Sequence, residues 1–176
     1  VIDHKPGAGL AVGAQVVANS APDGYTLLVN ASSMLVPTGA GGRTPADNLK
    51  DFVPISLAGG FPLVLVSSNK FEARTVPELI AYAKAHPGQI NFGSSGNGSL
   101  THLAAALFAQ QASLNMVHVP YRGISEALVD LGAERVQIVF AGAPTALPLA
   151  APGGKIRAMA VTSLQRTAAA PQLPSI

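Results

Sequence analysis

Short apolar runs alternate with helical patterns along most of this 176-residue chain, and this alternation limits the possible folds more than any other feature. The runs contain Val, Ile, Tyr or Phe and are bounded by Gly, Pro or Asn, which is typical of β-strands. The expected strands are Tyr25–Asn30, Leu63–Ser67, Ile90–Phe92, Met116–Val119, Val136–Phe140 and Ile156–Thr162. Because most of these runs are apolar along their whole length, we expect strands that are covered on both faces, as in a parallel sheet.

Helical patterns fill the intervals between the runs. Thr75-Val76-Pro77-Glu78 is a capping box with Pro early in the first turn, and it predicts a helix that continues to about His86. A second helix is expected from about Leu100 to Ala112, where apolar residues recur at helical spacing. Further helices are expected at Leu10–Asn19, Ser125–Leu131 and Thr145–Ala151. Strands that alternate with helices predict an α/β fold with right-handed crossovers.

The composition excludes several classes of function. Charged residues make up only 11% of the chain, against about 25% in an ordinary domain, and no three basic residues are adjacent. A nucleic-acid partner is therefore not expected, and the 5% of aromatic residues, without Trp, offers no stacking platform for single strands. The absence of Cys excludes disulfides, thiolate metal sites and Cys nucleophiles. No apolar stretch approaches the roughly 18 residues of a membrane span, and we expect neither a metal nor a cofactor.

The first third of the chain carries two glycine-rich segments. Gly7 and Gly9 precede the first expected helix and Gly13 lies near its start, with a spacing that resembles a dinucleotide-binding turn, but a turn that packs closely on another backbone is the preferred interpretation. The segment Ala31–Pro54 has little periodicity and is expected to be a long surface connection, a kind of loop that is often functional.

The stretch Gly93–His102 is the most informative motif. An expected strand leads into a Gly/Ser loop that opens a helix, so several backbone N–H groups and hydroxyls can be aimed at one point near the positive end of the helix dipole. The hydroxyls are those of Ser94, Ser95, Ser99 and Thr101. Such a loop can bind a carboxylate, a phosphate or a sulfate. A plain helix cap is the alternative. The sequence lacks the Gly-Lys-Ser/Thr of a phosphate-binding loop, and Asn97 stands where a nucleophile elbow needs Gly.

A second candidate lies at the end of the strand expected at 116–119. Ligands of open parallel sheets bind at the carboxyl ends of strands, so Tyr121 and the Gly123 backbone are candidate contacts, and Arg122 could pair with a ligand carboxylate. A Tyr that caps the edge of the core is the alternative. His102 and His118 have no helical i,i+4 pairing and His102 has no nearby acid, so structural, hydrogen-bonded histidines are preferred over ligands or catalysts.

Six motifs in order resemble one receptor family. They are Pro6–Gly9, Ala21–Leu28, Asp51–Ile55, Asn91–Gly98, His118–Gly123 and Gly154–Ser163. The chain resembles the Bug-type (TctC-like) substrate-binding receptors of tripartite tricarboxylate transporters, and the resemblance covers nearly its whole length.

The resemblance implies a periplasmic solute-binding receptor with a two-lobed, type II periplasmic-binding-protein-like α/β fold. It implies that 1–60 plus 155–176 form an incomplete lobe 1 and 61–154 form lobe 2, with the strands around Leu63–Ser67 and Ile156–Thr162 crossing between them. A small carboxylated ligand would lie between the lobes, and the partners would be membrane permease subunits, with the receptor a monomer. The implied ligand-binding residues are Ser94, Ser95, Gly96, Gly98, Ser99, Thr101, Tyr121, Gly123 and Ala141.

The chain also departs from the family pattern. The first β-α unit, with its Pro-Phe-x-x-Gly-Gly loop, should precede Val1, and a C-terminal segment should follow Ile176, so an internal portion of a receptor is expected. The segments Gly39–Arg43 and Gly132–Arg135 differ from the usual ones. Phe140-Ala141-Gly142 stands where the family usually has Phe-Asp-Asn. Loss of that Asp favours a ligand without an amino group.

Two other classes of function stay open at this point. One is an α/β hydrolase-like or cofactor-dependent enzyme that uses Ser95 with His102 or His118. The other is the effector-binding domain of a regulator with the same two-lobed architecture.

Overall fold

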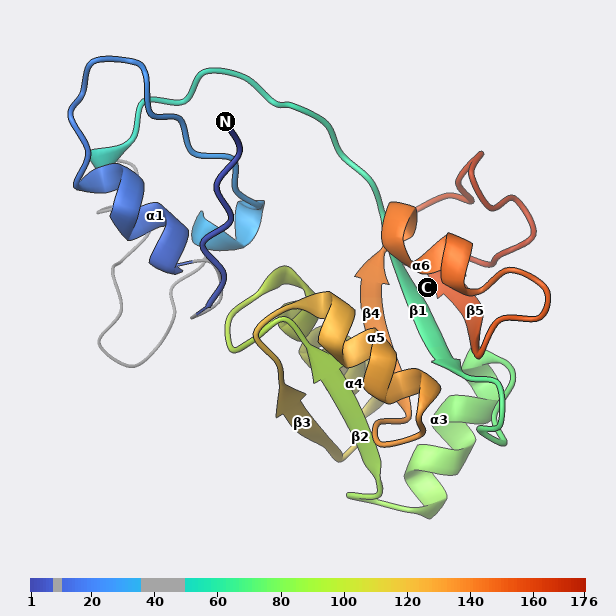
Figure 1. Ribbon diagram of the computed structural model, residues 1–176. Helices are drawn as coiled ribbons and strands as arrows, with labels where there is room; N and C mark the ends of the chain where they lie inside the picture. The colour runs from blue at the N-terminus through green and yellow to red at the C-terminus, as the bar shows by residue number, and fades with distance from the viewer. Residues whose placement is uncertain (8–10, 36–49) are drawn as a thin grey trace.

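The computed structural model describes residues 1–7, 11–35 and 50–176. One mixed five-stranded sheet dominates it, with the strand order β3-β2-β4-β1-β5 (Figure 1). The strands are β1 (Leu63–Ser68), β2 (Ile90–Ser94), β3 (Met116–Pro120), β4 (Ile138–Gly142) and β5 (Ile156–Val161). β2 runs parallel to β3 and β4, whereas β1 runs antiparallel to β4 and β5. The α/β class predicted from the sequence is confirmed.

The helices lie where the sequence patterns place them. They are α1 (Ala11–Ala18), α3 (Val76–Ala85), α4 (Leu100–Ala112), α5 (Ile124–Gly132) and α6 (Ala143–Leu149), with the short 3-10 helix η2 at Ser32–Leu35. Thr75 caps α3, because its side chain accepts a hydrogen bond from the Glu78 N–H, and Glu78 in turn accepts one from the Arg74 N–H. Ser99 caps α4 in the same way through the His102 N–H. These capping residues explain why the start of both helices can be predicted from the sequence.

Two apolar cores cover the two faces of the sheet. α5 and α6 pack on one face through Ala127, Leu131 and Ala146, opposite Val64 and Val66 of β1. On the other face α3 and α4 pack through residues that include Leu79, Ala83 and Ala105, against side chains of β1, β2 and β4. Every residue of β1 is buried. The result is a three-layer arrangement that presents the ends of β2 and β3 at one edge of the sheet.

Two strand predictions are wrong. The expectation of an all-parallel sheet fails at β1, because that strand is antiparallel to both of its neighbours. A strand covered on both faces is apolar in either direction, so its composition carries no information about direction. The strand expected at Tyr25–Asn30 does not form: Tyr25 is 92% exposed and Val29 88% exposed, and within the described ranges no strand pairs with this segment. β-propensity alone makes no strand without a pairing partner.

Some expectations fall outside the described residues. These are the start of the first helix at Leu10, Gly9 of the glycine motif, and most of the long connection at 31–54, including the segment 39–43. Figure 1 shows the blue N-terminal part apart from the sheet and joined to it by an extended segment that ends at β1. Helix α1 has no buried residue.

The end of the chain packs on the sheet. Ala170 and Leu173 lie in the same core as Val64, and the Val161 N–H donates to the Pro174 carbonyl. Residues of the segment 155–176 thus contact the sheet built by 63–142. The assignment of 155–176 to lobe 1 stays a prediction. Within the described part of the chain, every helix is too short or too polar to cross a membrane.

Ser67 in β1 provides a test of this packing. Its side chain is fully buried and its Oγ has no hydrogen-bond partner among the described residues, whereas the neighbouring Ser68 Oγ accepts from the Lys70 N–H at 3.2 Å. We expect Ser67→Ala to raise the free energy of unfolding by about 1 kcal/mol, because a buried unsatisfied hydroxyl is removed. Ser68→Ala, the matched control, should lower it. Urea unfolding of both variants checks this, and a loss of stability in Ser67→Ala would contradict it.

Candidate functional site

The candidate site is a loop at the carboxyl ends of β2 and β3. β2 ends at Ser94 and α4 begins at Leu100, and Ser94 is paired with Pro120 of the parallel strand β3. The Tyr121 N–H donates to the Ser94 carbonyl at 2.9 Å, so the turn after β3 is fastened to the start of the loop. The structure therefore brings together the two motifs that the sequence singled out, at the edge where open sheets bind ligands.

The loop hydroxyls bond mainly to one another. Thr101 Oγ1 accepts from the Ser95 N–H at 2.9 Å, and it lies 3.1 Å from Ser95 Oγ and 3.0 Å from Ser99 Oγ. Ser94, Ser99 and Thr101 are buried. The four hydroxyls thus shape the loop from within, as a helix cap does, and only Ser95 is partly exposed among them.

Two glycines give the loop its path. Gly96 has φ +109° and Gly98 has φ +74°, conformations in which a side chain is strained. The Gly96 N–H donates to Ser94 Oγ at 3.1 Å, and the Gly98 N–H donates to His102 Nδ1 at 3.1 Å. These residues therefore shape the loop and have their own N–H groups already bonded.

The donors left for a ligand are at the start of α4. The N–H groups of Asn97, Leu100 and Thr101 have no acceptor among the residues that the structure describes. The first turn of a helix leaves such N–H groups unpaired, and the helix dipole adds partial positive charge there. The sequence indicated the helix terminus but missed Asn97 and Leu100 as donors, because only the folded loop shows which N–H groups remain unbonded.

Two stacked histidines stand beside the loop. The rings of His102 and His118 lie 4.1 Å apart, and Phe92 stacks on His118 at 4.8 Å. His118 Nε2 lies 2.6 Å from Ser94 Oγ. Burial, with His102 close by, lowers the pKa of His118 to about 4, and burial also lowers the pKa of His102. Both rings are therefore neutral at pH 7, which agrees with the structural role preferred from the sequence.

The geometry does not suit nucleophilic catalysis. Ser95 Oγ pairs with Thr101 rather than with a histidine. Ser94 does meet His118, but Ser94 is fully buried, and no carboxylate of the described residues bonds the ring to orient it as a catalytic base. Among these residues there is also no group of three His, Cys, Asp or Glu side chains that could hold a metal ion.

Tyr121 is held by groups that the sequence did not point out. Its hydroxyl donates to Asp130 Oδ2 at 2.9 Å, and Arg135 Nη1 donates to Asp130 Oδ1 at 2.9 Å. Burial and the Asp130 carboxylate raise the pKa of Tyr121 to about 12, and the hydrogen bonds from Tyr121 and Arg135 lower the pKa of Asp130. The half-buried ring lies against Gly93 of β2. No short-range pattern joins Tyr121 to Asp130, so sequence spacing could not find this pair.

The other predicted contacts differ in exposure. Gly123 caps α5 without a side-chain hydrogen bond, and an added Cβ there would meet open space. Arg122 is exposed, and its N–H donates to Glu126. Ala141 is fully buried in the core under α5 and α6, so its side chain faces apolar neighbours in this structure. A ligand contact at Ala141 stays a prediction.

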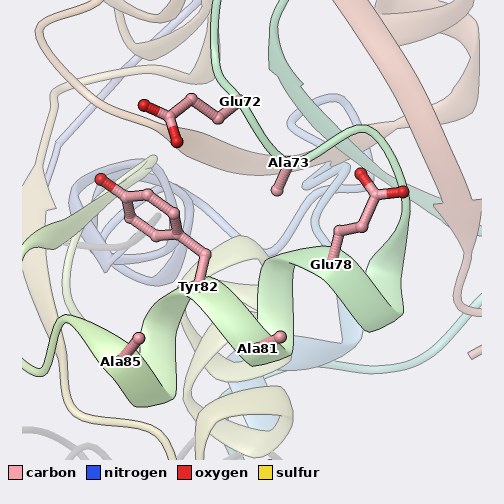
Figure 2. Close-up of a pocket in the computed structure, with 6 residues that line it drawn as sticks. All are labelled: Glu72, Ala73, Glu78, Ala81, Tyr82 and Ala85. Atoms are coloured by element: carbon pink, nitrogen blue, oxygen red, sulfur yellow. The ribbon is translucent and has the colours of Figure 1, made fainter.

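A hollow of about 370 Å³ lies elsewhere, along α3. Figure 2 shows the carboxylates of Glu72 and Glu78 beside it, with the Tyr82 ring between α3 and the preceding segment. Two carboxylates repel an anionic ligand. This hollow therefore fits the predicted carboxylate less well than the uncharged loop does.

Comparison with known sequences gives consistent matches. The family model "Tripartite tricarboxylate transporter family receptor" matches residues 1–176. The chain is 37% identical over 176 residues to the UPF0065 protein in the tcbD-tcbE intergenic region of Pseudomonas sp. (strain P51), of which it covers 52%. It is 35% identical to protein BugT of Bordetella pertussis, of which it covers 54%. The chain spans about half the length of the curated relatives it matches.

Comparison with solved structures gives the same fold. Periplasmic binding protein BugD has a TM-score of 0.89 at 29% identity, with 99% of this chain and 58% of BugD covered. Rpa4515 of R. palustris, solved with adipate, has a TM-score of 0.89 at 32% identity, with 100% and 59% covered. MatC of Rhodopseudomonas palustris, solved with bound malate, has a TM-score of 0.83 at 28% identity, with 96% and 57% covered.

Proposed function

Because the chain belongs to the tripartite tricarboxylate transporter receptor family, whose model matches all of residues 1–176, we propose that its protein captures a small organic carboxylate for a membrane permease. The family and the structural neighbours are solute-binding receptors and not enzymes, so the hydrolase-like and cofactor-dependent alternatives are rejected. Membership of a transporter receptor family also favours transport over the effector domain of a regulator.

The observation that carries the proposal is the set of unpaired N–H groups at the start of α4. Asn97, Leu100 and Thr101 offer these donors in a loop whose side chains are uncharged at neutral pH. A carboxylate accepts such hydrogen bonds and is stabilised by the helix dipole. We assign one ligand carboxylate to the loop 94–101 and the ligand's other end to the turn 121–123.

Dicarboxylates are the proposed ligand class. Rpa4515 was solved with adipate and MatC with malate, and both share this fold. The resemblance implies an Asp at the position that Ala141 occupies in this chain, so the counter-charge that such an Asp would give a ligand amine is missing. An unpaired ammonium enclosed in a cleft costs several kcal/mol. The proposed ligand therefore lacks an amino group.

The cellular setting follows from the same relatives. BugD is described as a periplasmic binding protein, which supports a periplasmic location here. The proposal includes two lobes, 1–60 plus 155–176 and 61–154, that close on the ligand. It also includes a monomeric receptor that docks on permease subunits.

A thermal-shift screen of the full-length protein tests this function. Adipate, malate and other mono- and dicarboxylates are compared with aspartate and glutamate. At a hundredfold excess over its dissociation constant, the bound acid should stabilise the protein by about 2.7 kcal/mol. The acid recovered afterwards should be chemically unchanged. Stabilisation by amino acids above all others, or by no acid at all, would contradict the proposal.

A further inference from the structure

Two loop N–H groups lie between the unpaired donors of Asn97 and Leu100: that of Ser99 donates to the Gly96 carbonyl, and that of Gly98 donates to the side chain of His102. Gly98 is flanked by Asn97 on one side and precedes the first turn of α4, where Leu100 and Thr101 lie. Its N–H donates to His102 Nδ1 at 3.1 Å. Gly98 has φ +74°, and as a glycine it has more backbone conformations open to it than any other residue. The position of the neighbouring donors therefore depends on this hydrogen bond.

A histidine can accept this bond in only one protonation state. The neutral ring accepts at Nδ1 when its hydrogen is on Nε2, whereas the protonated ring carries a hydrogen on both nitrogens. When His102 is protonated, its Nδ1–H faces the Gly98 N–H, and two donors cannot form a hydrogen bond with each other. It also places a positive charge next to the stacked ring of His118, 4.1 Å away.

The surroundings of His102 favour the neutral ring. β2 presents Phe92, stacked at 6.1 Å, and the uncharged Ser94, and β3 presents His118. The first turn of α4 holds no acidic residue. In the described part of the chain, no carboxylate bonds either ring, and His118 is the titratable group in contact with His102. Burial lowers the pKa of His102 below its usual 6.5.

We propose that His102 is a positioning residue, which holds the Gly98 turn in the shape that binds the ligand carboxylate and releases it when the ring is protonated. This inference rests on the proposed function, since it concerns the same loop. It makes ligand affinity fall in acid below pH 6.5, although a cation near a carboxylate would by simple attraction raise it. The direction of the pH effect therefore separates a positioning role from direct ligand contact.

Two variants isolate the hydrogen bond. His102→Asn places a side-chain oxygen where Nδ1 accepts the Gly98 N–H, but it cannot titrate between pH 5 and 7.5. His102→Phe keeps a ring that can stack on His118, but it has no acceptor. The probes are adipate and malate, measured by calorimetry with the full-length protein.

The expected results differ for each protein. From pH 7.5 to 5.0 the wild-type affinity should fall by a larger factor than that of His102→Asn, because a protonated His102 no longer accepts from the Gly98 N–H and that fraction of the protein leaves the binding shape. The ionisation of the acids themselves changes both proteins equally. At pH 7.5 His102→Asn should bind as the wild type does, and His102→Phe should bind at least about tenfold more weakly, as expected when a part-buried N–H loses its acceptor.

The outcomes separate the two proposals. If neither acid binds the wild type at pH 7.5, the proposed function fails and this inference fails with it. If the wild type binds but its pH profile matches that of His102→Asn, or its affinity rises in acid, only the positioning role is overturned. If His102→Phe does not fold, the pH profiles of the wild type and His102→Asn still decide whether His102 has the positioning role.

Discussion

Replacing Ser95 by Asp should weaken the binding of adipate and malate by at least about 100-fold. Ser95 is partly exposed in the loop, and its Oγ lies 3.1 Å from Thr101 Oγ1, next to an unpaired N–H of α4. We take a separation of about 5 Å between the introduced carboxylate and the ligand carboxylate, as for two charged groups held in one loop. At an effective dielectric constant near 20, that repulsion is about 3 kcal/mol, or somewhat more than 100-fold in affinity.

Two controls separate charge from size and from stability. Ser95→Asn has nearly the same size as Ser95→Asp without the charge, and it should lose much less affinity. Thr75→Asp adds the same charge at the cap of α3, where Asp is as good a capping residue as Thr, and it should bind as the wild type does. Calorimetry measures the three affinities. If the Ser95→Asp variant is folded and binds normally, the ligand carboxylate does not bind at this loop.

Replacing Gly93 by Val should lower the free energy of unfolding by about 3 kcal/mol. Gly93 lies in β2 between two strands, and a Cβ added to it would sit 3.0 Å from Ala127 Cβ, 3.2 Å from Val139 Cγ2 and 3.3 Å from the Tyr121 ring. Each contact is closer than ordinary packing, and the neighbours belong to α5, β4 and the ligand turn. Overpacking a close-packed core typically costs 1–3 kcal/mol, and here three separate neighbours have to move.

Gly123→Ala is the matched control for Gly93. An added Cβ at Gly123 meets open space, and its φ of −155° is extended backbone that any residue adopts. Urea unfolding should give Gly123→Ala a stability close to that of the wild type. A Gly93→Val variant as stable as the wild type would show that α5 is packed less tightly on β2 than the distances indicate.

The elements that local chemistry determines could be predicted from the sequence. Thr75 and Ser99 cap helices through their own side chains, so α3 and α4 begin where the motifs indicate. The loop after β2 was identified because small polar residues and glycines precede a helix. Its glycines do adopt the positive φ angles that only a folded loop requires. These signals involve residues that are close together in the chain, so they can be recognised in the sequence alone.

The parts that depend on distant residues could not be predicted. The direction of β1 depends on which strands flank it, and Tyr25–Asn30 lacks a partner in the described ranges despite its strand-like composition. The bonds that Ser95 and Ser99 make to Thr101 are also seen only in the folded loop, and a ligand contact through these hydroxyls stays a prediction. Each outcome depends on contacts made only in three dimensions.

A crystal structure of the full-length protein with adipate is the most direct test of the central claim, that the loop between β2 and α4 binds a ligand carboxylate. We expect a carboxylate whose oxygens accept hydrogen bonds from the N–H groups of Leu100 or Thr101, beside a neutral His102. Adipate bound only in the hollow beside Glu72 and Glu78, or at any place that leaves these N–H groups without an acceptor, would contradict it.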